Sequence, residues 1–506
     1  MTQINFRNFI NKSTAWFVFA AVLFLVLWNV GVFNDLNKRP QSMHNWAQCD
    51  RASVAKNYFE NGFNFFLPRV HNIANGTGIT GMEFPAINYA VAVLYRLFGF
   101  NEMYYRLLML LIFTASLFAA YDIALKFCNS NFLFAIISVL MYALSPVLMY
   151  YAANFIPDIA AAAFTVIAWR FFFATDLSQR KNIFLITLFL SLGCLIKITC
   201  IISAVAMLLI AALDFITNKK EAKQNRVVLI PVFVSIMLAA CWYSYSSWLN
   251  TKYQSGIFLM HPQPLKSFSH LTEVLGKITT GSAKEYYAYG FQWILIAINI
   301  VIIIFNKHAS RKLIMATCLL YAGNICFFML MASQFIQHDY YIITLLTAVL
   351  FNFILFFSVL ESILKNQYVK IITAVLFLGF ANYLMVFCKK NHTNRYDRDN
   401  WRFDLTTDRY FEMEPYLNGI GVKNNNAVIF YADPSPNISL YLIGRKGITV
   451  EREAVNSLEW RSRDTVFKFL IIDNTVYLSH PVIKPLIADK RKVGEYKGIT
   501  IFKLHD

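Results

Sequence analysis

Long apolar runs separated by short polar segments occupy most of the chain up to residue 388. Several runs, such as residues 15–33, 226–248 and 340–360, are long enough to cross the hydrocarbon core of a bilayer. Applying the positive-inside rule to the basic residues between the runs gives about 11 transmembrane helices, with the N-terminus in the cytoplasm. The first apolar run has no small-residue cleavage site, so we expect it to persist as the first span.

A polar loop of residues 34–102 follows the first span, and this topology places it outside the membrane. Residues 84–98 within it are apolar but are short for a span. Treating them as a span would move every later basic loop to the outer side of the membrane, against the positive-inside rule. We therefore predict that 84–98 is an interfacial helix on the outer membrane surface.

Residues 389–506 have a different pattern, because they are polar and contain no spanning run. Short β-type runs occur at 427–431, 438–443, 467–472 and 498–503. Turn formers such as Asp433-Pro434-Ser435-Pro436 separate them. The sequence therefore predicts a polytopic α-helical membrane domain in residues 1–388, with interfacial helices in the 34–102 loop. A small α/β or α+β domain in 389–506 follows, on the outer (periplasmic) side.

Composition supports a membrane protein, because only 15% of the residues are charged and the mean hydropathy is +0.47. A soluble protein carries about 25% charged residues. The net charge of +17 would suggest nucleic acid as a partner of a soluble protein. Here most basic residues lie in short loops, where they set the topology or face lipid phosphates, so we expect a lipid bilayer and no nucleic acid. The eight cysteines show no pattern typical of disulfides or zinc.

The first outer loop contains the strongest candidate for chemistry, Asp50. The pattern predicts a helix from Trp46 to Asn61, with Asn45 as N-cap and Gly62 as the stop. Helical spacing places four residues on one face: Trp46, Asp50, Val54 and Tyr58. An acid among aromatic residues is desolvated, which raises its pKa and suits a general base. The alternative is an ordinary exposed acid paired with Arg51.

Two further acids have a simple structural alternative. Glu83 precedes Pro85 at the predicted start of the interfacial helix, and Asp158 follows Pro157 at the outer end of a span. Stabilising a helix N-terminus would explain both positions. However, Asp158 is a second acid at the membrane face predicted for Asp50, and ionisable residues beside apolar spans are costly.

Lys197 interrupts a stretch that could otherwise be one span, and His338-Asp339-Tyr340-Tyr341 begins a later one. Lys197 could snorkel to the interface or bind a lipid phosphate. A lone histidine is more often structural, but His338 belongs to a set predicted at one face. The sequence has no Walker loop, dinucleotide fingerprint or HExxH motif, so neither a nucleotide-sugar donor nor an ATP-driven pump is supported.

Taken in order, these motifs resemble the GT-C membrane glycosyltransferases of the protein O-mannosyltransferase and aminoarabinose-transferase superfamily. The likeness is greatest for a bacterial branch with a Trp-x-Gln-x-Asp motif in the first loop. The resemblance covers about residues 15–350. The matching segments are Trp46-Ala47-Gln48-Cys49-Asp50, Glu83-Phe84-Pro85, Leu97-Phe98-Gly99, Arg106-Leu107, Ser145-Pro146, Pro157-Asp158, Leu192-Gly193-Cys194-Leu195-Ile196-Lys197 and His338-Asp339-Tyr340-Tyr341.

The resemblance implies transfer of a hexose or pentose from a polyprenyl-phosphate carrier to an acceptor lipid, glycan or protein. One carboxylate that deprotonates the attacking hydroxyl in line with the departing phosphate would give inversion. The reaction would take place at the periplasmic face of a bacterial inner membrane. Asp50 would match the catalytic acid that activates the acceptor, and Asp158 an acid that positions acceptor or donor. The donor phosphate would be handled by Arg51, Glu83, Lys197, His338 and Tyr340. Acceptor-side or supporting residues would be Trp46, Gln48 and Tyr341.

The chain departs from the aminoarabinose-transferase pattern at two positions. Phe84 stands where that family has a phosphate-binding lysine, and Ser53 where it has an arginine. Arg51 and Lys197 are candidates to supply the lost positive charge. No cofactor is implied, and the resemblance leaves a divalent metal open. Two alternatives also stay open: a flippase or transporter of a lipid-linked sugar, and a glycan polymerase or ligase that uses a diphosphate carrier.

Overall fold

The computed structural model describes residues 11–174, 179–217, 226–259, 261–397, 405–451, 454, 464–474 and 483–505. The first ten residues, the predicted cytoplasmic N-terminus, lie outside them. The chain divides into two compact units. The bundle unit consists of Met1–Leu36, Arg106–Tyr243 and Met260–Asn394. The sheet unit consists of Asn37–Tyr105, Ser244–Leu259 and Arg395–Asp506, so it joins the first loop to the C-terminal residues.

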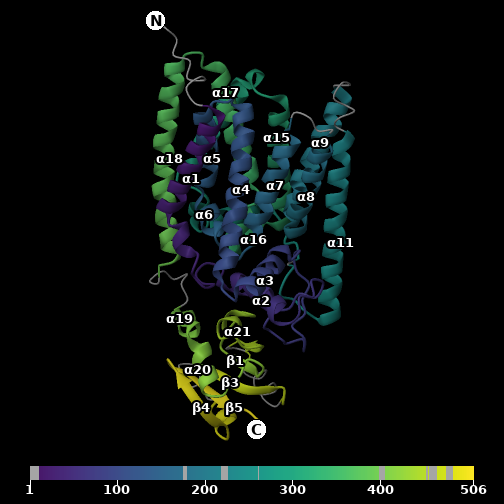
Figure 1. Cartoon of the computed structure of the whole chain (residues 1–506), viewed down its shortest axis with the longest axis vertical. Coiled ribbons are helices and arrows are strands. Elements are labelled where there is room, and N and C mark those ends of the chain that lie inside the picture. The colour runs from purple at the N-terminus through teal and green to yellow at the C-terminus, as the bar shows by residue number, and fades with distance from the viewer. Residues whose placement is uncertain are drawn as a thin grey trace. The chain divides into compact units, whose positions relative to one another are not determined.

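Long apolar helices run side by side in the bundle unit (Figure 1). Seven helices of the described chain are long and apolar enough to span a membrane: α1 (Lys12–Val30), α4 (Met103–Phe127), α9 (Ile201–Thr217) with the preceding turn η3 (Ile198–Cys200), α11 (Leu229–Tyr253), α15 (Arg311–Met331), α17 (Leu346–Ile363) and α18 (Gln367–Arg395). An eighth span results if α5 (Phe132–Ala143) and α6 (Pro146–Ala152), bent by 81° at Ser145-Pro146, are counted together. The polytopic helical class is therefore confirmed.

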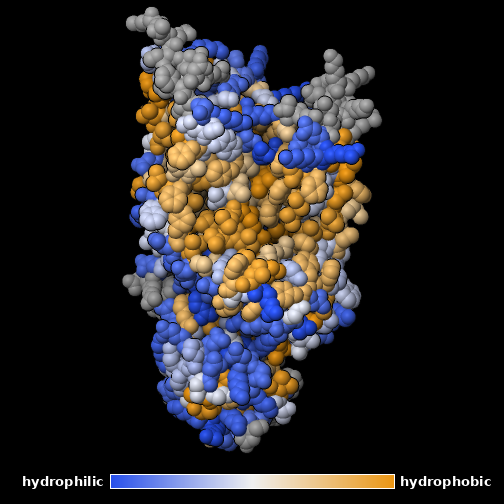
Figure 2. Space-filling model, viewed as in Figure 1, coloured by the Kyte–Doolittle hydropathy of each residue, from blue (hydrophilic) through white to orange (hydrophobic). Residues whose placement is uncertain are grey.

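Three further predicted spans coincide with shorter helices, α7 (Asp158–Phe172), α8 (Arg180–Ile196) and α14 (Phe291–Ile304). They contain 15, 17 and 14 residues, or about 20–26 Å of helix, which is less than a typical core needs. Each of the eleven predicted spans thus coincides with a helix or a bent pair of helices, but only seven or eight of these are long enough to span a membrane. Exposed apolar side chains form a broad band over the bundle (Figure 2), as expected for a surface facing lipid.

Short elements connect the long helices of the bundle unit. They are η2 (Val32–Asp35), η4 (Arg226–Val228), α12 (Phe268–Thr280), α13 (Ala283–Tyr286), η5 (Asn306–His308), α16 (Gln334–Gln337) and η6 (Asp339–Ile342). The turn η6 carries the predicted Asp339-Tyr340-Tyr341 segment.

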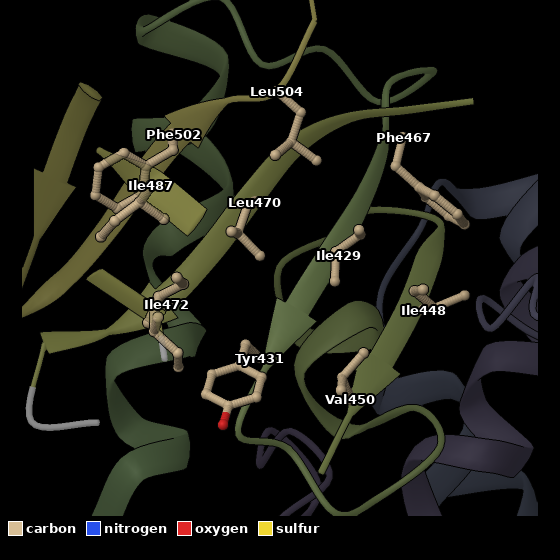
Figure 3. Packing of buried hydrophobic residues seen from close by; sticks show 11 residues of the cluster. Ile429, Tyr431, Ile448, Val450, Phe467, Leu470, Ile472, Ile487, Phe502 and Leu504 are labelled. Atoms are coloured by element: carbon tan, nitrogen blue, oxygen red, sulfur yellow. The ribbon is translucent and has the colours of Figure 1, made fainter. Parts of the chain in front are cut away.

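The sheet unit contains a five-stranded sheet in the order β2-β1-β3-β5-β4. Its strands are β1 (Ala427–Tyr431), β2 (Gly447–Val450), β3 (Phe467–Asp473), β4 (Arg491–Tyr496) and β5 (Ile499–Lys503). β1 pairs in parallel with β2 and β3, whereas β5 pairs antiparallel with β3 and β4. Figure 3 shows apolar side chains of β1, β2, β3 and β5 packing on one face, where Ile429, Leu470 and Phe502 belong to a single buried cluster.

The helices of the sheet unit are α2 (Asn45–Glu60), α3 (Ala86–Phe98), α19 (Leu405–Phe411), α20 (Met413–Gly419), α21 (Ile438–Leu442) and α24 (Ile483–Ile487). α2 packs against both α3 and α21. α3 coincides with the predicted interfacial helix at 84–98. The predicted cap of α2 is wrong, because Asn45 is its first helical residue and its Oδ1 accepts a hydrogen bond from the Cys49 thiol.

The predicted β-type run at 438–443 is also wrong, because residues 438–442 form α21. Its first two amides are satisfied from the preceding turn. Ser435 Oγ accepts from the Ile438 N–H at 3.0 Å, and Asp433 Oδ2 accepts from the Ser439 N–H at 2.9 Å. Capping by these two side chains favours a helical turn over a strand. A short apolar run that is buried on all sides has no periodicity that distinguishes a helix from a strand, so the sequence pattern does not show this.

A short segment of the first loop extends the sheet beyond β2. The Gly447 N–H donates to the carbonyl of His71, and the Ile73 N–H donates to the carbonyl of Gly447, at 3.1 and 2.7 Å. Asn72 thereby forms a parallel bridge with Gly447. Glycine is required here, because a Cβ at position 447 would lie 1.9 Å from the carbonyl oxygen of Val428.

Candidate active site

Asp50 is fully buried in the sheet unit. Its Oδ1 accepts a hydrogen bond from Nδ2 of Asn437 at 2.8 Å. Its Oδ2 has no hydrogen-bond partner among the described residues. One carboxylate oxygen is therefore held and the other is left to accept a proton.

Burial raises the pKa of Asp50 to about 7. The positive charge of Arg51 and the hydrogen bond from Asn437 lower this pKa, whereas the negative charges of Glu83 and Asp433 raise it further. A carboxyl group with a pKa near neutrality is suited to general-base chemistry.

The burial of Asp50 follows from the position of α2. Helices α3 and α21 pack on α2, so 13 of its 16 residues are buried. Val54 and Tyr58, one and two turns after Asp50, belong to an apolar cluster with Val70, Met82 and Ala92. The alternative of an exposed acid paired with Arg51 is therefore wrong.

Arg51 instead forms an ion pair with Glu83, with 3.0 Å between Nε and Oε1. The guanidinium also lies over the ring of Phe258, and Asn88 Nδ2 donates to the carbonyl of Arg51 at 2.8 Å. Phe84, the next residue after Glu83, packs edge-on against Phe65. Arg51 and Glu83 therefore act on the pKa of Asp50 in opposite directions, and Arg51 acts more strongly.

Gln48 and Trp46 support the loop in different ways. Gln48 is fully buried, and its Nε2 donates to the carbonyls of Gln41 and Met43, both at 2.8 Å. These bonds hold the chain that enters α2. Trp46 is half-buried, and its ring meets that of His44 edge-on.

Ser53 holds His71, another buried residue of the first loop. Ser53 Oγ accepts from the His71 N–H at 2.8 Å and lies 2.6 Å from the ring Nδ1. Asn57 Nδ2 also lies within hydrogen-bond reach of Nδ1, at 3.2 Å. Burial holds the pKa of His71 well below its ordinary value, so the ring is neutral and Nδ1 acts as the acceptor. Ser53 thus anchors the segment that joins the sheet.

The second group of predicted site residues lies in the bundle unit. Lys197 Nζ is 2.6 Å from Oδ1 of Asp158, whose side chain is only 3% exposed. The pair forms because α7 and α8 pack closely along their length. Gly193 permits this approach, since a Cβ there would lie 2.6 Å from Oγ1 of Thr165. The helix α8 ends at Ile196, which leaves Lys197 extended beside the first residue of α7.

Aromatic residues of the His338-Asp339-Tyr340-Tyr341 segment surround this ion pair. Lys197 Nζ lies 4.4 Å from the ring centre of Tyr341 and 5.5 Å from that of Tyr340. His338 stacks on Tyr341. These residues therefore form one cluster, in which the half-buried Lys197 ammonium contacts a buried carboxylate and two aromatic faces: Asp158, Lys197, His338, Tyr340 and Tyr341.

Sequence reasoning missed three polar residues beside these clusters. Asn437 and Asp433 lie in a segment that resembles an ordinary Pro-rich turn, and only the fold brings them to α2. Tyr151 donates to Oδ1 of Asp339 at 2.7 Å, and nothing in its apolar surroundings indicates this role. A cavity of about 380 Å³ lies elsewhere in the bundle unit and contains none of the predicted site residues.

Within the described ranges, no three His, Cys, Asp or Glu side chains are placed to hold a metal ion.

Comparisons with known proteins agree with this architecture. Residues 83–258 match the sequence profile of the family described as dolichyl-phosphate-mannose-protein mannosyltransferase. A comparison with curated proteins finds no match.

Solved structures of ArnT from Cupriavidus metallidurans are similar over 98% of this chain and 99% of theirs, at 12% identity. The TM-score is 0.63 for the form bound to undecaprenyl phosphate and 0.60 for the apo form. The apo oligosaccharyltransferase of Archaeoglobus fulgidus is similar over 91% of this chain and 70% of its own, at 11% identity and a TM-score of 0.59. The chain therefore has the fold of the GT-C membrane glycosyltransferases, as the order of its motifs predicts.

Proposed function

We propose that this protein is a glycosyltransferase that moves a sugar from a polyprenyl-phosphate donor to an acceptor hydroxyl, with inversion and with Asp50 as the base. The observation that carries the proposal is the buried Asp50, with one hydrogen-bonded oxygen, one unpartnered oxygen and a pKa raised to about 7. The family profile names a dolichyl-phosphate sugar, and one similar structure holds undecaprenyl phosphate. Both carriers are polyprenyl phosphates.

The reaction needs one proton transfer and one displacement. Asp50 takes the proton of the acceptor hydroxyl as its oxygen attacks the anomeric carbon. The bond between that carbon and the phosphate oxygen breaks, and the polyprenyl phosphate leaves with the bonding electrons. A single displacement inverts the anomeric centre and requires no covalent intermediate on the protein.

The leaving phosphate gains negative charge in the transition state, so a fixed cation stabilises it more than the ground state. The resemblance gives two candidates for this cation. Arg51 adjoins Asp50 in the sheet unit and pairs with Glu83. Lys197 lies in the bundle unit, where it pairs with Asp158 beside Tyr340 and Tyr341, and His338 stacks on Tyr341.

The acceptor and the sugar are found by comparing the envelope glycans, lipids and proteins of cells with and without the gene by mass spectrometry. Purified protein in liposomes is then given the identified acceptor with monophosphate- and diphosphate-linked donors. We expect a new glycosidic bond from the monophosphate donor, and none from Asp50→Asn. Product from the diphosphate donor alone would indicate a polymerase or ligase. Movement of labelled lipid across the bilayer without a new bond would indicate a flippase.

A further inference from the structure

A residue from the C-terminal part of the chain touches Asp50 directly. Asn437 is fully buried at the start of α21, and its Nδ2 donates to Oδ1 of Asp50 at 2.8 Å. We propose that Asn437 is a positioning residue, which fixes Asp50 so that Oδ2 is the oxygen that accepts the acceptor proton. The inference rests on the proposed function, in which Asp50 is the base. It gives the C-terminal domain a direct part in the reaction.

The orientation of the Asn437 amide is fixed by a second hydrogen bond. Its Oδ1 accepts from the backbone N–H of Asn72 at 2.8 Å, so its Nδ2 has to face Asp50. Asn72 is itself held, because its Nδ2 donates to the carbonyl of Pro436 at 2.9 Å. The amide therefore bridges the first loop and the C-terminal segment at Asp50.

The backbone that carries Asn437 is held on both sides. On one side, Asp433 Oδ1 accepts from the N–H and the hydroxyl of Ser435, at 2.8 and 2.7 Å, and its Oδ2 caps α21. On the other side, Asn72 lies in the segment that pairs with Gly447 at the edge of the sheet. A side chain fixed in this way loses little freedom when it orients a catalytic group.

The charges around Asp50 explain why an amide suits this position. Arg51 and the Cys49 thiol adjoin it on α2, Glu83 acts on it from the segment before α3, and Asp433 acts on it from the segment before α21. An arginine or lysine in place of Asn437 would form a full ion pair and weaken the base. A carboxylate there would add a third nearby negative charge. The neutral amide stabilises the ionised form of Asp50 and leaves its charge available.

A purely structural role for Asn437 makes a different prediction. Loss of a structural contact lowers the amount or stability of folded protein and reduces activity equally across pH. Loss of a positioning contact also moves the pH at which Asp50 loses its proton. The two roles are therefore separated by the acid limb of kcat/KM, which is the pH range over which kcat/KM falls as Asp50 becomes protonated.

The test uses full-length protein with Asn437→Ala and with Asn437→Asp, which keeps the size and the acceptor for the Asn72 N–H. Asn426→Asp is the matched control, because Asn426 Oδ1 likewise accepts one backbone N–H, from Lys423, in an exposed turn. Two quantities are measured against pH: kcat/KM, and the infrared carboxyl band that Asp50→Asn removes. The infrared band needs no substrate.

We expect both Asn437 variants to move the acid limb and the carboxyl band to higher pH, with the larger shift for Asn437→Asp, where two carboxyls share protons. Near pH 6, Asn437→Ala should lose at least about tenfold in kcat/KM, and less at high pH. Asn426→Asp should behave as wild type. The inference is overturned if folded Asn437 variants keep both the limb and the band at their wild-type positions. If no sugar is transferred from the donor, the proposed function fails. The carboxyl band, which needs no substrate, still decides whether Asn437 controls the pKa of Asp50.

Discussion

The buried Asp158 and the half-buried Lys197 form an ion pair in the bundle unit, with 2.6 Å between Oδ1 and Nζ. The carboxylate begins α7 and the ammonium follows the end of α8, so the contact depends on the close packing of the two helices at Gly193. The sequence suggested separate roles for these residues. Their pairing means that a change to one also leaves the other without its partner.

Substitutions of this pair should be strongly non-additive. Lys197→Met leaves the Asp158 carboxylate buried without its cation, which should lower the free energy of unfolding by about 3–5 kcal/mol. Adding Asp158→Asn should restore part of that loss. Unfolding in detergent measures both, and Lys181→Met, at an exposed lysine of the same helix, is the control. Additive losses from the two single variants would show that the pair is not coupled.

Arg51 should influence the pH dependence of transfer. Its positive charge lowers the pKa of Asp50, so Arg51→Met should raise that pKa and move the acid limb of kcat/KM to higher pH. Transfer at neutral pH should fall about tenfold, and the part of this loss that comes from the raised pKa should recover as the pH increases. The exposed Arg96→Met provides the matched control. A loss that is the same at every pH would argue against an electrostatic effect on Asp50.

Ser53 should matter for stability and not for proton transfer. Ser53→Ala removes both contacts to His71 and leaves its buried N–H unpaired, which should cost about 1–3 kcal/mol in the free energy of unfolding. Thermal or chemical unfolding measures this loss, with Ser247→Ala at an exposed position as the control. The acid limb of kcat/KM should stay in place. A shifted limb with unchanged stability would instead connect Ser53 to the chemistry.

The sequence predicts the helical part of the fold well, because a long apolar run in a bilayer satisfies its backbone hydrogen bonds by forming a helix. It also predicts β1, β3 and β5, where apolar and β-branched residues lie between turn formers. It does not reveal β2, which has only four residues, or β4, which begins with charged and exposed residues. The run at 438–443 was assigned the wrong class because capping by Asp433 and Ser435, and not its own pattern, makes it helical.

The candidate site was predicted in part. Local spacing indicated Asp50, and two interrupted apolar stretches indicated Asp158 and Lys197. Asn437 carries no local signal, because it reaches Asp50 only after the first loop joins the edge of the sheet beside Gly447. Contacts between segments so distant in sequence depend on tertiary packing, which one sequence does not display.

We propose that Asp50 is the base of a sugar transfer from a polyprenyl phosphate. This role is tested by kcat/KM against pH for the wild type and for Asp50→Asn in liposomes, with the monophosphate-linked donor. Wild-type transfer should rise with pH through about 7, where Asp50 ionises. Folded Asp50→Asn should be slower by a factor of about 10²–10⁴ and should lack this rise. Full transfer by folded Asp50→Asn, with the wild-type pH profile, would contradict this role.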